Sequence, residues 1–219
     1  LFNSEQLDFN AFEKEIVTTT SENDIKSIKL DDIRSNPYQP RTYFNEEALN
    51  ELASSIKEHG ILEPVILKKS IKGYELIAGE RRCKAARIAG LETVPAIIKD
   101  FNDQEMMELA LIENVQREDL NAIEEAKAYK NIMTKLNMTQ EEVSKRFGKS
   151  RSYITNLLGL LTLPKSVMDL VEGGSISSSH ARVLSKIDES DKIISLAKKI
   201  KEDGISVREL ENMSKEENI

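Results

Sequence analysis

Cysteine, histidine and tryptophan are scarce in this sequence of 219 residues, with one, two and no copies respectively. A single cysteine, Cys83, excludes an internal disulfide bond and any zinc site built from several cysteines. The two histidines are too few to favour a structural metal centre. No apolar run approaches the roughly 20 residues of a membrane span, and no signal-peptide pattern opens the chain. We therefore expect a cytoplasmic protein.

The overall charge is not typical of a nucleic-acid-binding protein. Lysine and arginine number 31 against 38 aspartates and glutamates, a formal net charge of −7. The distribution is uneven, because residues 1–33 carry eight acidic and three basic side chains, whereas residues 143–186 carry seven basic and two acidic ones. A basic segment can bind phosphate even within an acidic chain, so the net charge excludes no nucleic-acid function.

Local signals divide the chain into a tail, an α/β part and a helical part. Residues 1–24 have weak periodicity and no glycine or proline, and we expect them to form a flexible tail. Residues 25–120 combine extended structure at 25–33 with strands and helices. The expected strands span 64–67, 74–78 and 94–98, and the expected helices span 46–59, 80–89 and 103–117. Residues 121–219 show only helical signals, so the predicted fold class is an α+β domain followed by an all-α domain.

Capping residues mark several of the expected helix starts. Asn45, Asp103 and Asn121 each precede a helical pattern, and Asn121 with Glu124 has the spacing of a capping box. Gly60 follows the helix that Asn45 begins, and a glycine at this position is typical of a helix end.

Residues 139–161 have the spacing of a helix-turn-helix. Thr139 and Glu142 form a second capping-box pattern, and Gly148 separates two helical stretches where a positive φ angle is needed. The second stretch carries side chains able to reach base edges and phosphates: Lys149, Ser150, Arg151, Ser152, Tyr153, Thr155 and Asn156. A helical hairpin used only for packing has the same pattern. The positive charge concentrated at 143–186 favours DNA binding.

An arginine-rich turn lies between a predicted strand and a predicted helix, at residues 77–82. A helix N-terminus favours an anion, because its first backbone N–H groups are free and its dipole is positive there. Arg81 and Arg82 add donors that suit a polyphosphate better than a single carboxylate. The alternative is a solvated first turn whose arginines pair with neighbouring acidic residues, and the local sequence alone does not decide between the two.

A second polar cluster, residues 113–117, ends the helix expected at 103–117. The Glu113 carboxylate and the Asn114 amide oxygen can together hold Mg²⁺, with water and phosphate oxygens completing the octahedron. The alternative is an ordinary i,i+4 ion pair between Glu113 and Arg117. Arg41, in a proline-containing loop, supplies a third arginine that could reach the same ligand.

Taken together, these stretches resemble the ParB family of chromosome- and plasmid-partition DNA-binding proteins. The matching segments follow the family's order and spacing: NPYQPR (36–41), ELASSIKEHGI (51–61), AGERRCKAARIAG (78–90), ALIENVQREDL (110–120), TQEEVSKRFGKSRSYITNLLGLLTLP (139–164) and ISSSHARVL (176–184). The resemblance implies a CTP-binding domain at 25–120 and a helix-turn-helix DNA-binding domain at 121–219. It further implies a dimeric clamp that binds the centromere-like site parS, closes with CTP and Mg²⁺, and opens after slow CTP hydrolysis.

The resemblance also assigns residues to the nucleotide site by position. The residues expected to bind nucleotide are Gln39, Arg41, Gly60, Ile61, Gly79, Glu80, Arg81, Arg82, Asn114 and Arg117. The residues expected to act in catalysis are Gln39, Arg41, Glu80 and Glu113, with Glu113 and Asn114 as metal ligands. In this assignment Gln39 and Arg41 contact the γ-phosphate region, whereas the stretch with Gly60 and Ile61 lines the cytosine.

Three residues outside the helix-turn-helix are expected at the DNA: Ser179, His180 and Arg182. His180 has a second interpretation, as a residue that only starts a helix. Arg151 and Ser179 resemble the parS-reading pattern, whereas the family's nucleoid-occlusion paralogue has glutamine and arginine at these places. Leu157 and Thr162 also differ from that paralogue's lysines, so the parS-binding branch is favoured.

The partners that the resemblance implies are double-stranded parS-like DNA, a second copy of the chain, a ParA-type ATPase and condensin, with a location at the nucleoid. Glu63 stands where the family usually has glutamine, which bears on base selectivity. Among residues 1–24, only Lys14 offers a basic side chain for stimulating an ATPase. Nothing after residue 215 matches the family's C-terminal dimerisation domain.

Two other classes of function compete with this interpretation. Sulfiredoxin-type and kinase activities occur on related α/β folds, but the sulfiredoxin motif has its reactive cysteine immediately after the glycine. Cys83 lies four residues past Gly79, and a small packed hydrophobe is the favoured interpretation. A repressor that uses no nucleotide is the second alternative, and stoichiometric CTP binding would exclude it.

Overall fold

The computed structural model describes residues 7–38 and 44–216. The chain folds as two compact units, residues 8–114 and residues 115–216 with Leu7, and each unit is described by itself. The division at Asn114 falls a few residues before the boundary expected at 120. An α/β unit followed by a helical unit confirms the predicted fold class.

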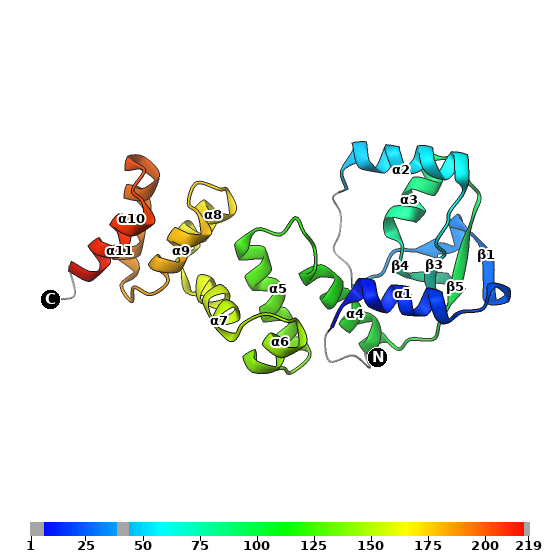
Figure 1. The fold of residues 1–219 in the computed structure, drawn as a ribbon, viewed down its shortest axis with the longest axis horizontal. Helices are drawn as coiled ribbons and strands as arrows, with labels where there is room; N and C mark the ends of the chain where they lie inside the picture. Colours follow the sequence, from blue (N-terminus) through cyan, green and yellow to red (C-terminus); the bar gives the residue numbers. More distant parts are fainter. Residues whose placement is uncertain (1–6, 39–43, 217–219) are drawn as a thin grey trace. The chain divides into compact units, whose positions relative to one another are not determined.

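The first unit is built on a five-stranded mixed sheet with the order β1-β5-β3-β4-β2 (Figure 1). The strands are β1 (Ile25–Lys29), β2 (Ile33–Arg34), β3 (Val65–Ser70), β4 (Gly73–Ala78) and β5 (Thr93–Ile98). β3 and β4 form the predicted hairpin, while β1 pairs antiparallel with β5 and β2 pairs parallel with β4. Buried residues of β3 and β5, among them Val65, Leu67 and Val94, form the core on one face. The strands expected from the sequence are therefore confirmed.

Helices α2 (Glu46–His59) and α3 (Glu80–Ile88) pack against each other (Figure 1). The Asn45 side chain accepts a hydrogen bond from the Ala48 N–H at 3.1 Å, so the predicted cap is confirmed. Gly60 ends α2 with a φ angle of +74°. Because Ala53, Ile56 and Ala85 are buried where the helices meet, α2 holds α3 and its N-terminal turn in place.

Helix α4 (Asp103–Val115) begins at the predicted position, but the predicted cap is wrong. Asn102, rather than Asp103, accepts a hydrogen bond from the Glu105 N–H, and the Glu105 carboxylate accepts one from the Asn102 N–H, both at 2.9 Å. The helix also ends at Val115, two residues before Arg117. Asparagine and aspartate are both favoured N-cap residues, so residue type alone does not show which of two adjacent ones caps the helix.

The N-terminal segment differs from the expected flexible tail. Residues Phe9–Thr19 form α1, and a 3₁₀ turn at Glu22–Asp24 precedes β1. The Asp8 carboxylate caps α1 by accepting hydrogen bonds from two backbone N–H groups of its first turn. Phe9 and Phe12 are the buried side chains of this helix, and two aromatic rings give only a weak periodic signal in the sequence.

The second unit is helical throughout the part that the structure describes. Its helices are α5 (Ala122–Lys135), α6 (Gln140–Arg146), α7 (Arg151–Gly159), α8 (Lys165–Glu172), α9 (Ser178–Leu184), α10 (Ser190–Asp203) and α11 (Val207–Glu216). Both predicted capping boxes, at Asn121 and at Thr139, are confirmed. Within the described ranges, no single helix is long and apolar enough to cross a membrane. The segments Arg151–Thr162 and Lys165–Glu172 reach that length and apolar composition only when taken together, and they are bent by 120° relative to each other.

Candidate functional sites

The arginine-rich turn is shaped by Gly79, which joins β4 to α3. Gly79 has a φ angle of +111°, in the left-handed region that side chains other than glycine rarely adopt. A Cβ atom at this position would lie 2.6 Å from Cγ1 of Val65, so the close approach of the turn to β3 also requires glycine. Gly79 has no side chain to cap α3, and the first turn of the helix is left to an external or a neighbouring anion.

Arg82 is held in one orientation by several acceptors of the first unit. Its Nη1 donates to the backbone oxygens of Glu63 at 3.1 Å and Pro64 at 3.0 Å. Its Nη2 donates to the carboxylate of Glu13 in α1. The side chain of Arg82 is only 17% exposed, so this guanidinium is both oriented and largely shielded from water.

Glu80 and Arg81 have different surroundings from Arg82. The Glu80 carboxylate accepts a hydrogen bond from Ser35 Oγ at 2.9 Å and lies 3.9 Å from the ammonium group of Lys84. That ammonium group also lies 3.7 Å from the centre of the Phe44 ring. Arg81 is exposed, so its guanidinium is accessible from the solvent. Glu80 thus links the start of α3 to the loop after β2, which contains Ser35.

Other residues expected at the nucleotide lie in varied positions. Gln39 and Arg41 lie outside the described residues. Just before them, the buried Asn36 accepts a hydrogen bond from the Tyr38 N–H at 2.9 Å, which fixes the start of that loop. Gly60 is exposed at the end of α2, and Ile61 packs on the core below it.

Glu113 and Asn114 are consecutive, half-buried residues in the last turn of α4. A carboxylate and an amide oxygen are the hard ligands that Mg²⁺ prefers, so these two side chains have the ligand atoms that a magnesium site needs. Across the described ranges, no group of three or more acidic, histidine or cysteine side chains could hold a metal by itself. A magnesium ion here would therefore depend on phosphate and water oxygens for its remaining ligands.

Arg117 belongs to the second unit, where its guanidinium binds Asp119 in a fork. Nε donates to one carboxylate oxygen of Asp119 at 2.9 Å and Nη2 to the other at 2.7 Å. Arg117 and the arginine-rich turn belong to different units. Within the described part of the first unit, Gly79, Glu80, Arg81 and Arg82 lie together at the start of α3.

Cys83 lies on the buried face of α3 and has no feature of a reactive thiol. It is 4% exposed, and it belongs to the core cluster of the sheet. Burial raises the pKa of the thiol to about 11, with a further contribution from the nearby Glu80 carboxylate. A thiol in this state is protonated at neutral pH, which argues against a sulfiredoxin-type reaction.

The single cysteine gives a direct test of this burial. At pH 8, iodoacetamide should modify Cys83 in the folded chain at least about a hundredfold more slowly than in the unfolded chain, since each pKa unit lowers the thiolate fraction about tenfold. The rate in the folded chain should keep rising as the pH approaches 11. The labelled fraction would be followed by mass spectrometry with and without denaturant, and equal rates would contradict the buried position.

The helix-turn-helix has the geometry that the sequence predicts. Gly148 has a φ angle of +63°, and the Ser144 hydroxyl donates to the Lys149 backbone oxygen at 2.6 Å, which fixes the turn. Ser150 caps α7 by accepting a hydrogen bond from the Tyr153 N–H at 3.1 Å. At the start of α7, Arg151 and its neighbour Ser152 are exposed. The N-terminal turn of α7 is therefore a rigid, solvent-facing surface with basic and hydroxyl groups.

Tyr153 is anchored by a residue that sequence reasoning missed. Its hydroxyl donates to the Glu125 carboxylate of α5 at 2.7 Å, and Lys149 Nζ lies 5.4 Å from its ring centre. Partial burial and this hydrogen bond raise the pKa of Tyr153 to about 12, so the phenol stays neutral. A cavity of about 230 Å³ adjoins them, and its lining includes Asn156 and Arg182 together with apolar side chains such as Leu157. No local signal could identify Glu125, because its contact with α7 depends on helix packing.

The residues expected on α9 separate into two kinds. Arg182 is exposed and shares the cavity with α7, whereas Ser179 is half-buried. Both ring nitrogens of His180 have partners inside the unit, Ser177 Oγ at 2.6 Å and the Ile205 backbone oxygen at 2.8 Å. These contacts favour the interpretation of His180 as a residue that fixes the start of α9.

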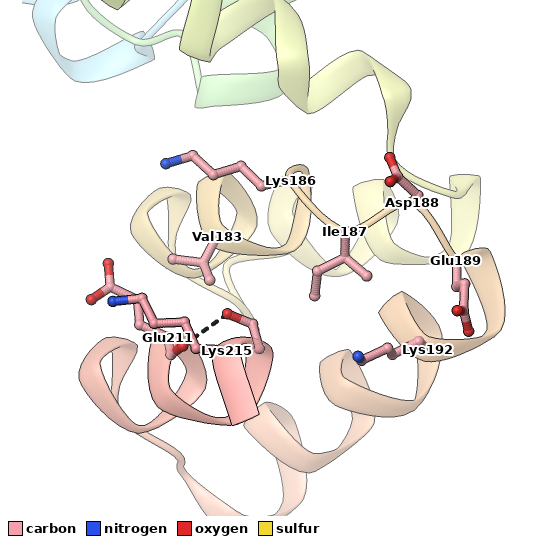
Figure 2. A pocket seen from close by; sticks show the side chains of 9 residues that line it. Val183, Lys186, Ile187, Asp188, Glu189, Lys192, Glu211 and Lys215 are labelled. Atoms are coloured by element: carbon pink, nitrogen blue, oxygen red, sulfur yellow. Dashed lines mark hydrogen bonds between the residues drawn. The ribbon is translucent and has the colours of Figure 1, made fainter. Parts of the chain in front are cut away.

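A further cavity of about 420 Å³ lies among the ends of α9, α10 and α11 (Figure 2). Its charged lining is of mixed sign, with three lysines and three acidic residues: Lys186, Lys192, Lys215, Asp188, Glu189 and Glu211. This mixture selects neither anions nor cations, and no predicted residue lies in it.

The two units define the chain as a helix-turn-helix protein with a separate α/β domain suited to an anionic ligand. The model of the ParB N-terminal domain matches residues 14–115, and that of the ParB HTH domain matches residues 118–219. The chain belongs to the ParB family, as the resemblance predicted.

Individual relatives agree with this assignment. Stage 0 sporulation protein J of Bacillus subtilis is 48% identical over 88% of this chain and 68% of its own length. A nucleoid occlusion protein of Shouchella clausii is 41% identical over 90% of this chain and 69% of its own length. The crystal structure of C-terminally truncated ParB from Caulobacter crescentus, complexed to the centromeric parS site, is 39% identical with a TM-score of 0.73. It covers 87% of this chain and 99% of the Caulobacter chain.

Proposed function

We propose that this protein is a chromosome-partition factor that binds a parS-like DNA palindrome and uses CTP as a switch. The observation that carries the proposal is the exposed, Ser150-capped N-terminus of α7, in a chain that is 39% identical to a ParB solved on parS. In this proposal, CTP binding closes a dimer into a clamp that slides along DNA at the nucleoid. Slow hydrolysis then opens the clamp.

The DNA step is assigned to the first turn of α7 and its surroundings. Arg151 is the residue we assign to base reading, because an exposed arginine at the start of a recognition helix can bind guanine through two donors. Ser150, Ser152 and Lys149 would contact phosphates beside it. Glu125 would hold Tyr153 in place from behind, because the phenol already donates its proton to that carboxylate.

The nucleotide step is assigned to the first unit. Arg81 and Arg82, at the N-terminus of α3, would bind the phosphates, with Gly79 allowing their close approach to the backbone. Glu113 and Asn114 would hold Mg²⁺, which when bound neutralises phosphate charge. Gln39 and Arg41 would act at the terminal phosphate. Glu80, tied to Ser35 by a 2.9 Å hydrogen bond, would couple the occupied site to the loop before it.

A second candidate is the nucleoid-occlusion branch of the family, since a relative of that name is 41% identical to this chain. Arg151 and Ser179 favour the parS-binding branch, as do Leu157 and Thr162. A ParA-type ATPase and condensin are the protein partners we propose, and Lys14 in α1 is exposed.

Retention on circular DNA tests the proposed function. With CTP and Mg²⁺, the chain should remain on a closed circle that carries parS after a salt wash, and should leave the same DNA once it is linearised, because a ring slides off open ends. A circle with scrambled parS and reactions with ATP are the controls. Binding that is indifferent to nucleotide would leave a simple repressor, and retention on a DNA site bound by a nucleoid occlusion protein, instead of parS, would favour the second candidate.

A further inference from the structure

Helix α1 is firmly attached to the first unit, although the sequence gives it little periodicity. The rings of Phe9 and Phe12 are buried, and the Phe12 ring centre lies 6.0 Å from that of Phe101, which precedes α4. Asp8 caps the helix and so fixes its first turn. These contacts fix the orientation of α1 and so determine which of its side chains face the rest of the unit.

The side chain that α1 presents to the arginine-rich turn is Glu13. Its carboxylate binds Nη2 of Arg82, and the two side chains are only 18% and 17% exposed. The other terminal nitrogen of Arg82 is occupied by the backbone oxygens of Glu63 and Pro64, so the Nη2 edge is the one that faces an anion. A guanidinium edge that binds a carboxylate suits a phosphate equally, because both offer anionic oxygens at hydrogen-bonding distance.

We propose that Glu13 is an in-chain competitor for the phosphate position on Arg82, and that α1 is a latch which nucleotide must displace. The inference rests on the proposed function, since it concerns the same nucleotide site. Glu13 and a nucleotide phosphate cannot both occupy the Nη2 edge. The apparent affinity for nucleotide should therefore equal the intrinsic affinity multiplied by the fraction of molecules in which α1 has moved away from Arg82.

Glu63 strengthens the same effect. Its carboxylate lies 4.0 Å from Nη1 of Arg82, and its side chain is 73% exposed. With Glu13 in place, two carboxylates therefore surround one guanidinium at the entrance to the turn. An incoming triphosphate is repelled until α1 moves Glu13 away, and the departure of Glu13 leaves Arg82 oriented by the two backbone oxygens that still hold Nη1.

The test is the affinity for CTP of Glu13→Gln, compared with the matched variant Glu15→Gln on the exposed side of α1. Removing the competing charge should raise the affinity about tenfold, within the roughly 5- to 150-fold range that couplings between sites span. Glu15→Gln should change it less than about twofold, as expected of an exposed charge. Phe12→Ala, which removes the anchor of α1 rather than the charge, should act in the same direction as Glu13→Gln.

A second measurement separates the latch from a purely structural ion pair. In the unchanged protein, CTP should increase hydrogen exchange at the amides of Phe9–Thr19, because the helix must leave when the phosphate binds. A Glu13→Gln variant that binds CTP no better than the unchanged protein would overturn the latch and leave the proposed function standing. If neither protein binds CTP, the proposed function fails, and the latch fails with it.

Discussion

Replacing Arg151 by alanine should abolish most of the preference for parS over scrambled DNA. Each arginine that binds guanine through two donors contributes about 1–3 kcal/mol of discrimination. Since a palindrome is read by two copies, the loss should be about 2–6 kcal/mol, roughly 30-fold to 10⁴-fold in the affinity ratio. The ratio of the two dissociation constants, measured at one salt concentration, is the quantity to compare.

Lys165→Ala is the matched control for this prediction. Lys165 is an exposed basic residue at the start of α8, and it belongs to the same basic segment as Arg151. Removing it should weaken binding to both duplexes alike, or leave it unchanged, because a phosphate contact carries no sequence information. If Arg151→Ala behaves like this control, α7 does not read the site through Arg151.

Arg82→Ala should reduce the affinity for CTP about ten- to a hundredfold, while binding to parS persists. The expected loss corresponds to about 1.5–3 kcal/mol, which is typical of a hydrogen bond between charged groups. The Glu63 and Pro64 backbone oxygens orient the guanidinium of Arg82 through Nη1, so the side chain itself is already in place to bind a phosphate once Glu13 has left Nη2. Titration calorimetry with CTP measures the effect.

Arg87→Ala on the same helix serves as the control for Arg82→Ala. Arg87 lies in the last turn of α3 and donates to the Leu30 backbone oxygen at 2.7 Å, so its removal affects folding and not the turn. It should leave the affinity for CTP unchanged. In the Arg82→Ala background, Glu13→Gln should lose its effect as well, because the site for which Glu13 competes is gone. Equal CTP affinity in the Arg82→Ala and unchanged proteins would reduce the arginine-rich turn to a surface feature.

Local signals predict much of this fold because they act within one turn. The caps at Asn45, Asn121 and Thr139 each need only a side chain and a backbone N–H three residues later. Gly79 and Gly148 were identifiable as turns for the same reason, and both have positive φ angles. The arginine-rich turn and the helix-turn-helix could therefore be predicted from residue type and spacing.

The parts that the sequence did not predict depend on distant contacts. Helix α1 is stabilised by the ring contact between Phe12 and Phe101 and by the hydrogen bond from Arg82 to Glu13. Neither Phe101 nor Arg82 is near α1 in sequence. Glu125 contacts Tyr153 only because α5 packs against α7. Residue spacing does not indicate contacts between residues that are far apart in sequence. The sequence of α1 therefore has the pattern of a tail, and Glu125 has that of an ordinary acidic residue.

The strand order of the first unit has a consequence for how the chain folds. Antiparallel pairing of β1 with β5 brings Ile25 opposite Ile97, and β5 also pairs with β3. During synthesis, β1 has no partner until the chain as far as β5 has left the ribosome. The helical unit instead forms mainly from neighbours in sequence such as α6 and α7, whose contacts close short loops. The first unit is therefore the slower to fold, and its β1 edge stays open longest to pairing with other chains.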